Sequence, residues 1–123
     1  MSDLETTIDT YLEAYGEADP ARRAELTARS WSEEGRLSDP PMEARGHADL
    51  DAMFAAVQSQ FPGHTFRRTS AVDAHHGVAR YGWDLVGPDG TVAVAGMDVA
   101  VPGDDGRLVR VAGFFGDLPP RAD

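Results

Sequence analysis

One carboxylate stands in the middle of the most strand-like stretch of the chain, and its position suggests chemistry. The stretch is Thr91–Val101, TVAVAGMDVAV, whose β-branched and apolar residues are typical of a strand buried on both faces. Asp98 lies near its centre. Because an unpaired buried carboxylate costs several kcal/mol, such a group must find a cation, hold a proton or face a cavity.

The residue types that the chain lacks narrow the chemistry further. It contains no cysteine, which excludes disulfides, thiolate nucleophiles and cysteine-based zinc sites. All eleven basic residues are arginines, so Schiff-base catalysis and a nucleotide-binding P-loop are also excluded. Carboxylates, imidazoles, hydroxyls and guanidiniums remain as the groups that could act on a substrate.

The four histidines lack the spacing of a metal site. His75 and His76 are adjacent in a predicted turn, where neighbouring side chains point apart, and His47 and His64 belong to no HxxxH-type pattern. The sequence also contains no GxSxG nucleophile motif and no glycine-rich phosphate loop. We therefore expect neither a bound metal nor another cofactor.

Length, composition and charge exclude several classes of partner. A chain of 123 residues with 41% hydrophobic residues is expected to form one globular domain. Its net charge of -10, with no basic stripe, argues against binding to nucleic acid or to an anionic membrane. Apolar runs fall short of the roughly 20 residues of a spanning helix, and the acidic start MSDLETTIDT is unlike a signal peptide. We expect a cytoplasmic protein.

Hydrophobic periodicity predicts three helices in the first half of the chain. The first spans residues 3–17. Asp19 followed by Pro20 is a typical N-cap and first-turn pair for a second helix over residues 20–29. A third helix is predicted over residues 47–61, before a proline and a glycine that terminate it.

The second half of the chain changes to the two-residue period of strands. A weak strand pattern at residues 31–38 precedes the third helix. Four stronger strand patterns follow the helix, at residues 64–73, 78–86, 91–101 and 107–115. An order of helices first and then strands, with glycine-rich turns between the strands, is typical of an α+β fold. In such a fold the helices cover one face of a curved antiparallel sheet.

Two turns fix the strand register and therefore the direction in which Asp98 points. The turn at 87–90 aligns Asp98 with Ala79, and the turn at 103–106 aligns it with Val111. The other residues on that face are apolar or aromatic: Tyr81, Trp83, Leu85, Val109, Gly113 and Phe115.

A register shifted by one residue would instead place Asp98 beside Arg110 and provide a cation. It would also bring that arginine onto the apolar face, and since a buried face fixes register, we favour the first alignment. In it, Arg80 and Arg110 both point away from Asp98. We expect burial to raise the pKa of Asp98 and keep it neutral near pH 7, so that it can donate a hydrogen bond.

Three segments together resemble the nuclear-transport-factor-2-like superfamily, and within it the SnoaL-like group and the ketosteroid isomerases. They are TIDTYLEAYGEADP, WSEEGRLSDPPMEARG and GMDVAVPGDDGRLVRVAGFFG. The likeness covers nearly the whole chain, which we interpret as a single domain over residues 1–123. The resemblance implies a cone-shaped curved antiparallel sheet, packed with three helices from the N-terminal half around an apolar pocket.

The resemblance to the ketosteroid isomerases also implies three catalytic roles. Asp39, followed by Pro40, falls at the position of the family's general base. Tyr11 and Asp98 fall at the positions of its oxyanion donors, and the use of a neutral aspartic acid there is the standard example of this pattern. Asp39 would then move a proton next to a ketone while Tyr11 and Asp98 hydrogen-bond the enolate oxygen.

Two functions are consistent with these residues. The first is an isomerase-like enzyme that acts, without a cofactor, on a small hydrophobic ketone of steroid or polyketide type. The alternative is a ligand-binding or orphan domain without turnover, in which Asp98 orients a polar ligand group. If their roles are purely structural, Tyr11 is a buried core tyrosine and Asp39 is a turn residue.

The aromatic and apolar residues on the predicted inner faces form either core or pocket wall. We expect nine of them to line the pocket: Tyr15, Trp31, Phe54, Phe61, Phe66, Tyr81, Trp83, Val111 and Phe115. Since cones of this kind commonly pair through the open face of the sheet, the resemblance also implies a homodimer.

Overall fold

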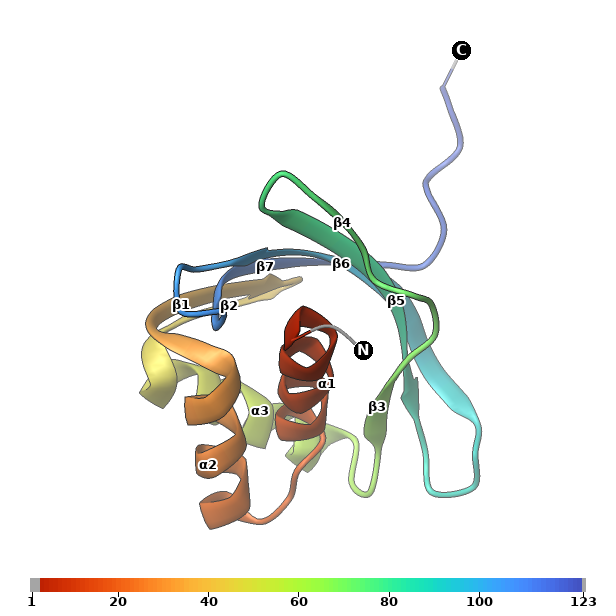
Figure 1. The fold of residues 1–123 in the computed structure, drawn as a ribbon. Helices are drawn as coiled ribbons and strands as arrows, with labels where there is room; N and C mark the ends of the chain where they lie inside the picture. The colour runs from red at the N-terminus through yellow and green to blue at the C-terminus, as the bar shows by residue number, and fades with distance from the viewer. Residues whose placement is uncertain (1–2, 123) are drawn as a thin grey trace.

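A computed structural model describes residues 3–122 of the chain (Figure 1). Met1, Ser2 and Asp123 belong to the single domain expected from the sequence but lie outside the described residues. The elements follow in the order α1 (Asp3–Tyr15), α2 (Pro20–Ser30), β1 (Trp31–Asp39), β2 (Met42–Arg45), α3 (Gly46–Gln60), β3 (Thr65–Arg68), β4 (Asp73–His75), β5 (Val78–Val86), β6 (Val92–Pro102) and β7 (Leu108–Phe115).

The strands form one strongly curved sheet, and α1 lies inside its curve with α2 and α3 beside it (Figure 1). The strand order is β2-β1-β7-β6-β5-β3, and β4 also pairs with β5. This arrangement confirms the predicted α+β class. The sheet is mixed rather than wholly antiparallel, because β1 pairs with β7 in parallel. Turn signals report only hairpins between consecutive strands, so they could not indicate a pairing between the two ends of the chain.

The second helix begins as the sequence predicts. The Asp19 side chain accepts a 2.9 Å hydrogen bond from the Arg22 backbone N–H, and Pro20 occupies the first turn of α2. Arg23 is buried on the inner side of α2 and donates a 2.8 Å hydrogen bond to Asp51 of α3. This ion pair fixes the two outer helices against each other.

Of the strand predicted at residues 64–73, only β3 and Asp73 are in strands: β3 ends at Arg68, and β4 begins at Asp73 and extends through Ala74 and His75 of the predicted turn. Between them, the Ser70 hydroxyl accepts a 2.9 Å hydrogen bond from the Gly82 backbone N–H. A side chain thus takes the place of a backbone acceptor, and the regular ladder stops. Gly82 is required at this point, since a Cβ there would lie 2.6 Å from the Thr69 hydroxyl oxygen.

The pairing around Asp98 is displaced by two residues from the expected register. Asp98 lies opposite Tyr81 on β5 and Gly113 on β7, rather than opposite Ala79 and Val111. The register changes beside each turn, which the turn sequences do not indicate. Because the displacement is even, Asp98 keeps the predicted face.

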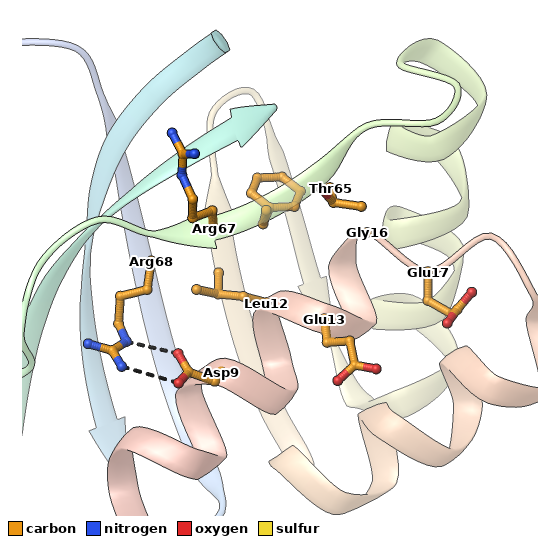
Figure 2. Close-up of a pocket in the computed structure, with 9 residues that line it drawn as sticks. Asp9, Leu12, Glu13, Gly16, Glu17, Thr65, Arg67 and Arg68 are labelled. Carbon is orange, nitrogen blue, oxygen red and sulfur yellow. Dashed lines mark hydrogen bonds and ion pairs between the residues drawn. The ribbon is translucent and has the colours of Figure 1, made fainter. Parts of the chain in front are cut away.

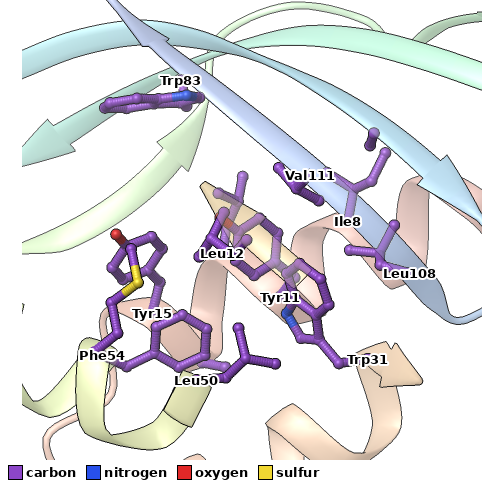
Figure 3. Packing of buried hydrophobic residues seen from close by; sticks show 14 of the residues in the cluster. Ile8, Tyr11, Leu12, Tyr15, Trp31, Leu50, Phe54, Trp83, Leu108 and Val111 are labelled. Atoms are coloured by element: carbon purple, nitrogen blue, oxygen red, sulfur yellow. The ribbon is translucent and has the colours of Figure 1, made fainter. Parts of the chain in front are cut away.

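Buried apolar residues fill the space between α1, α3 and the inner face of the sheet (Figure 3). Tyr11 is central to this core. Its ring lies edge-on to Trp31, with centroids 5.2 Å apart, and within 6.1 Å of the Phe54 ring. The N-terminal helix therefore carries its tyrosines into the deepest part of the fold.

Candidate active site

A cavity of about 210 Å³ lies between α3, the segment after β1 and the inner face of the sheet. Its walls are largely apolar and aromatic. They are formed by Tyr15, Asp39, Pro40, Pro41, Met42, Val57, Gln60, Phe61, Phe66, Trp83, Leu85, Val94 and Phe115. Asp39 is the one acidic residue among them, so a ligand in this cavity would contact a single carboxyl.

A larger and more open groove lies between α1 and β3, and its ionisable groups are of a different kind (Figure 2). Asp9 accepts hydrogen bonds of 2.8 and 3.1 Å from Arg68 in a bidentate ion pair. Glu13, Glu17 and Arg67 also line this groove. Asp9 and Arg68 neutralise each other, and Glu13 and Arg67 are largely exposed and pair with Arg22 and Asp84 outside the groove. Exposed ion pairs of this kind interact weakly, so we place the candidate site in the smaller cavity.

Asp39, the last residue of β1, is 4% exposed and is held from one side only. Its Oδ2 accepts a 2.9 Å hydrogen bond from the Tyr15 hydroxyl. Its Oδ1 is buried and has no hydrogen-bond partner among residues 3–122. Burial raises the pKa of Asp39 to about 6, and the bond from Tyr15 opposes that rise.

Asp98 is 1% exposed, and both of its oxygens accept hydrogen bonds from the neighbouring strand. Oδ2 accepts from the Tyr81 hydroxyl at 2.7 Å, and Oδ1 accepts from Trp83 Nε1 at 2.8 Å. Burial raises the pKa of Asp98 to about 7, the hydrogen bonds from Tyr81 and Trp83 oppose the rise, and the charge of Asp39 adds to it. This is the direction expected from the sequence.

Three buried phenols surround the two carboxyls. Burial raises the pKa of Tyr11, Tyr15 and Tyr81 above the usual value, and the charges of both aspartates add to the rise in each case. All three hydroxyls therefore keep their protons at any physiological pH. Tyr11 has no hydrogen bond to either carboxyl in the described structure, yet it lies within electrostatic reach of both Asp39 and Asp98.

Gly113 of β7 is the point at which the two carboxyls meet. β7 lies between β1, which ends with Asp39, and β6, which carries Asp98. A Cβ at Gly113 would collide with Asp39 Oδ1 and would lie 3.1 Å from Asp98 Oδ1. Only a residue without a side chain leaves room here for both carboxyls.

The structure brings the three predicted catalytic residues together, but not in one wall. Tyr11, Asp39 and Asp98 belong to α1, β1 and β6 and share the inner end of the site. Of the three, Asp39 lines the cavity, whereas Tyr11 and Asp98 do not line it and are buried.

The predicted lining residues separate into two sets. Five of them line the cavity, namely Tyr15, Phe61, Phe66, Trp83 and Phe115. Four are buried in the core instead, namely Trp31, Phe54, Tyr81 and Val111. For Trp31 and Phe54 the reason is Tyr11 of α1, whose ring packs against both and covers them. Alternation along a strand shows which face a residue takes, but not whether a helix covers it.

Sequence reasoning missed the hydrogen-bonding roles of Tyr15 and Tyr81 and the place of Gly113. A signal existed for Tyr15, which follows Tyr11 by one helical turn and so points the same way. Tyr81 was placed on the correct face, and the displaced register concealed its pairing with Asp98.

Residues 3–122 contain no group of three or more acidic or histidine side chains arranged to hold a metal ion. None of their helices has the length and apolar character needed to cross a membrane.

The family model of the SnoaL-like domain matches residues 8–111 of the chain. Among solved structures, the chain is similar to a candidate isomerase of the SnoaL-like family from Agrobacterium tumefaciens str. C58. The identity is 35% and the TM-score 0.87, over 95% of this chain and 100% of that one. No curated protein matches the chain.

Two more distant structures share the fold. An NTF2-like protein of unknown function from Exiguobacterium sp. 255-15 is 19% identical with a TM-score of 0.72, over 91% of this chain and 99% of that one. A candidate polyketide cyclase from Sinorhizobium meliloti is 13% identical with a TM-score of 0.66, over 93% and 100% respectively. At such identities the likeness shows the fold alone.

Proposed function

We propose that this chain, which belongs to the SnoaL-like domain family, is an enzyme that works without a cofactor. It moves a proton between carbons next to the ketone of a small hydrophobic molecule. The observation that carries this proposal is the state of Asp39. Tyr15 holds one of its carboxyl oxygens, the other has no hydrogen-bond partner within the described part of the chain, and the residue lies in the wall of an apolar cavity. The 35% identical relative described as a candidate isomerase supports the same reaction class.

Asp39 is the proposed general base. With a pKa of about 6 it is ionised near pH 7, yet it is more basic than an exposed carboxylate. A base is most effective when its pKa lies near the working pH, and burial provides that shift here. Asp39 takes a proton from the carbon next to the ketone and returns it to another carbon of the same molecule. The reaction therefore conserves all atoms and needs no co-reactant.

Tyr11 and Asp98 are the proposed donors to the oxygen that becomes negative in this reaction. A protonated phenol and a neutral carboxylic acid can each donate a hydrogen bond, and the raised pKa values favour those forms. Because Tyr11 and Asp98 lie within electrostatic reach of Asp39, we propose that the substrate binds with its oxygen at the Asp39 end of the cavity and its hydrocarbon part toward the opening.

The proposed substrate is a compact relative of a steroid or polyketide ketone, with one or two rings. A volume of about 210 Å³ is smaller than the roughly 300–1,000 Å³ of pockets for drug-sized ligands. The aromatic walls from Phe66, Trp83 and Phe115 suit a flat unsaturated ring.

The test uses exchange of deuterium from solvent into the α-carbon of one- and two-ring cyclic ketones, followed by NMR. Asp39→Asn should lower the exchange rate by roughly 10²- to 10⁴-fold. Its affinity for a phenol, which mimics the enolate, should stay within about twofold, because the side chain keeps its shape. Asp104→Asn, in the exposed turn after β6, is the matched control and should retain the wild-type rate.

Phenol binding without any exchange across the ketone panel would contradict the proposal and leave a ligand-binding domain. A rate that Asp39→Asn does not change would show that a different group is the base.

A homodimer in the cytoplasm is the proposed setting of this activity. The support is the exposure of large apolar side chains at Val109 and Phe114 of β7 and at Leu118 after it. Light scattering tests the dimer: the mass should be twice that of the 13.2 kDa chain. A mass of one chain at micromolar concentration would reject it.

A further inference from the structure

We propose that Asp39 and Asp98 act as one carboxyl pair that shares a proton across Gly113, with Asp98 donating to the unpartnered Oδ1 of Asp39. The pair deepens the proposed function, since it regulates the base of that same site. Any effect of the pair on a reaction rate depends on the proposed function being correct. The existence of the pair is inferred only from the geometry of the adjacent strands β1, β7 and β6.

The backbone register brings the two carboxyls to the same place. On one side of β7, Asp98 lies directly opposite Gly113. On the other side, Ser38 of β1 lies opposite Ala112 in a parallel pairing, so that Asp39 and Gly113 follow at the next position. The two aspartates therefore flank one glycine, and the Oδ1 atoms of both approach the site where its Cβ would be.

The count of hydrogen-bond donors and acceptors gives the direction of the bond. Trp83 Nε1 can only donate, and the Tyr81 hydroxyl donates to Asp98 as well. A neutral Asp98 has an O–H proton of its own, and as long as the Tyr81 hydroxyl donates rather than accepts, neither of these bonds takes it. Asp39 Oδ1 is a buried acceptor without a donor. Since buried polar atoms are almost always paired, each group provides what the other lacks.

The surroundings favour one proton on the pair. Tyr11 and Tyr15 approach the carboxyls from α1, and Tyr81 and Trp83 approach from β5. All four are neutral donors, and none of the ion pairs among residues 3–122 includes either aspartate. Two negative charges here would have no cation to balance them. One shared proton reduces the charge of the pair to a single negative unit.

Asp98 is thereby a positioning residue for Asp39. It would hold Oδ1 of the base while Tyr15 holds Oδ2, so that the carboxylate is oriented from both sides. As Asp39 accepts a proton from the substrate, its negative charge passes to the substrate oxygen in the same step. The Asp98 O–H would then turn from Asp39 Oδ1 to that oxygen as the charge moves, as the proposed function requires.

The test is an NMR titration of the protein labelled with ¹³C at the aspartate carboxyl carbons, without any substrate. In the wild type, the signals of Asp39 and Asp98 should both move at each of two pH steps, because the protons belong to the pair. In Asp98→Asn, Asp39 should titrate in one step. In Asp39→Asn, the midpoint of Asp98 should fall by about one pH unit or more, because the neighbouring charge is gone.

Asp104→Asn is the matched control and should leave both steps unchanged. The proposal would be overturned if each carboxyl titrated in a single step and if replacing one aspartate left the titration midpoint of the other unchanged. The wild-type titration decides this alone if a variant does not fold.

The enzymatic readout separates positioning from a structural role. The pH profile of kcat/KM should show a second inflection in the wild type. In Asp98→Asn that inflection should be absent, in addition to the lower rate at every pH that follows from losing a donor to the substrate oxygen, whereas a purely structural role predicts a single inflection already in the wild type. Absence of any proton exchange in the wild type would reject the proposed function. It would leave the titration result intact.

Discussion

Tyr81 lies directly opposite Asp98 on the neighbouring strand, and its hydroxyl donates a 2.7 Å hydrogen bond to Asp98 Oδ2. This relationship explains how a carboxyl persists in the interior without a cation. A cross-strand pair brings donor and acceptor together through the sheet itself, and Trp83, two residues further along β5, supplies the second donor. The pairing of β5 with β6 thus determines the protonation behaviour of the site.

The first prediction concerns the hydroxyl of Tyr81. Tyr81→Phe leaves Asp98 Oδ2 without its donor, and loss of a buried bond of this kind costs roughly 1–3 kcal/mol in the free energy of unfolding. Since that bond lowers the pKa of Asp98, its removal should raise the pKa above about 7. Urea unfolding and carboxyl NMR measure the two effects.

Tyr11→Phe is the matched comparison, because it deletes the same atom from a buried ring that has no hydrogen bond to either carboxyl. It should destabilise the protein less. Equal losses in the two variants would mean that the bond to Asp98 contributes nothing specific.

The second prediction is an unusual dependence of stability on pH. The folded-state pKa values of Asp39 and Asp98, about 6 and about 7, lie above the roughly 3.9 of an unfolded aspartate. Between about pH 4 and pH 7 the folded state therefore binds more protons than the unfolded state. The free energy of unfolding should fall as the pH rises through this window.

Urea unfolding at pH 5 and pH 7.5 measures this dependence. The wild type should be more stable at pH 5, by roughly 2 kcal/mol or more. Repulsion within a chain of net charge -10 acts in the same direction, so the decisive comparison is with Asp98→Asn. That variant should show a smaller difference and Asp104→Asn an unchanged one. If the free energy of unfolding depended on pH equally in all three proteins, Asp98 could not be the source of that dependence.

Local signals predicted much of the fold because they depend on neighbouring residues. The cap at Asp19, the third helix and the bounds of β5 follow from short-range sequence chemistry and agree with the structure. The resemblance to the SnoaL-like group is likewise confirmed, and the fold is shared with an NTF2-like protein. The link to the ketosteroid isomerases in particular stays a proposal.

The remaining features depend on contacts between distant segments. The register beside Asp98 shifted because irregularities follow the two turns, and the face survived because alternation has a period of two. The meeting of Asp39 and Asp98 depends on β7 entering between β1 and β6, with a glycine at one position. No local pattern shows which glycine has that role.

The third prediction concerns Tyr15 and the base. The Tyr15 hydroxyl holds Asp39 Oδ2 at 2.9 Å and lowers its pKa, so Tyr15→Phe should raise that pKa above about 6. The acidic limb of the kcat/KM profile should move to higher pH. Loss of orientation should also reduce kcat by roughly 10- to 100-fold.

Tyr11→Phe provides the contrast here, because Tyr11 is proposed to contact the substrate oxygen rather than the base. Its rate should fall at every pH while the acidic limb stays in place. An acidic limb that Tyr15→Phe does not move would exclude Asp39 as the group that titrates in catalysis.

The fourth prediction is that ligand size has an upper limit. Phenols should bind more tightly as they grow from one ring to two. A four-ring phenolic steroid should bind no more tightly than the two-ring phenol, because the cavity has a volume of only about 210 Å³. Trp83 lines the cavity, so quenching of tryptophan fluorescence reports binding.

Phe115 should set this limit, since it lines the cavity and lies edge-on to Trp83 with the ring centroids 5.7 Å apart. Phe115→Ala should therefore improve steroid affinity relative to the two-ring phenol. Phe114→Ala is the matched control, because Phe114 is adjacent and more than half exposed but does not line the cavity. It should leave the ratio of the two affinities unchanged. Tighter binding of the steroid than of the two-ring phenol by the wild type would show that the cavity expands, and that Phe115 does not restrict it.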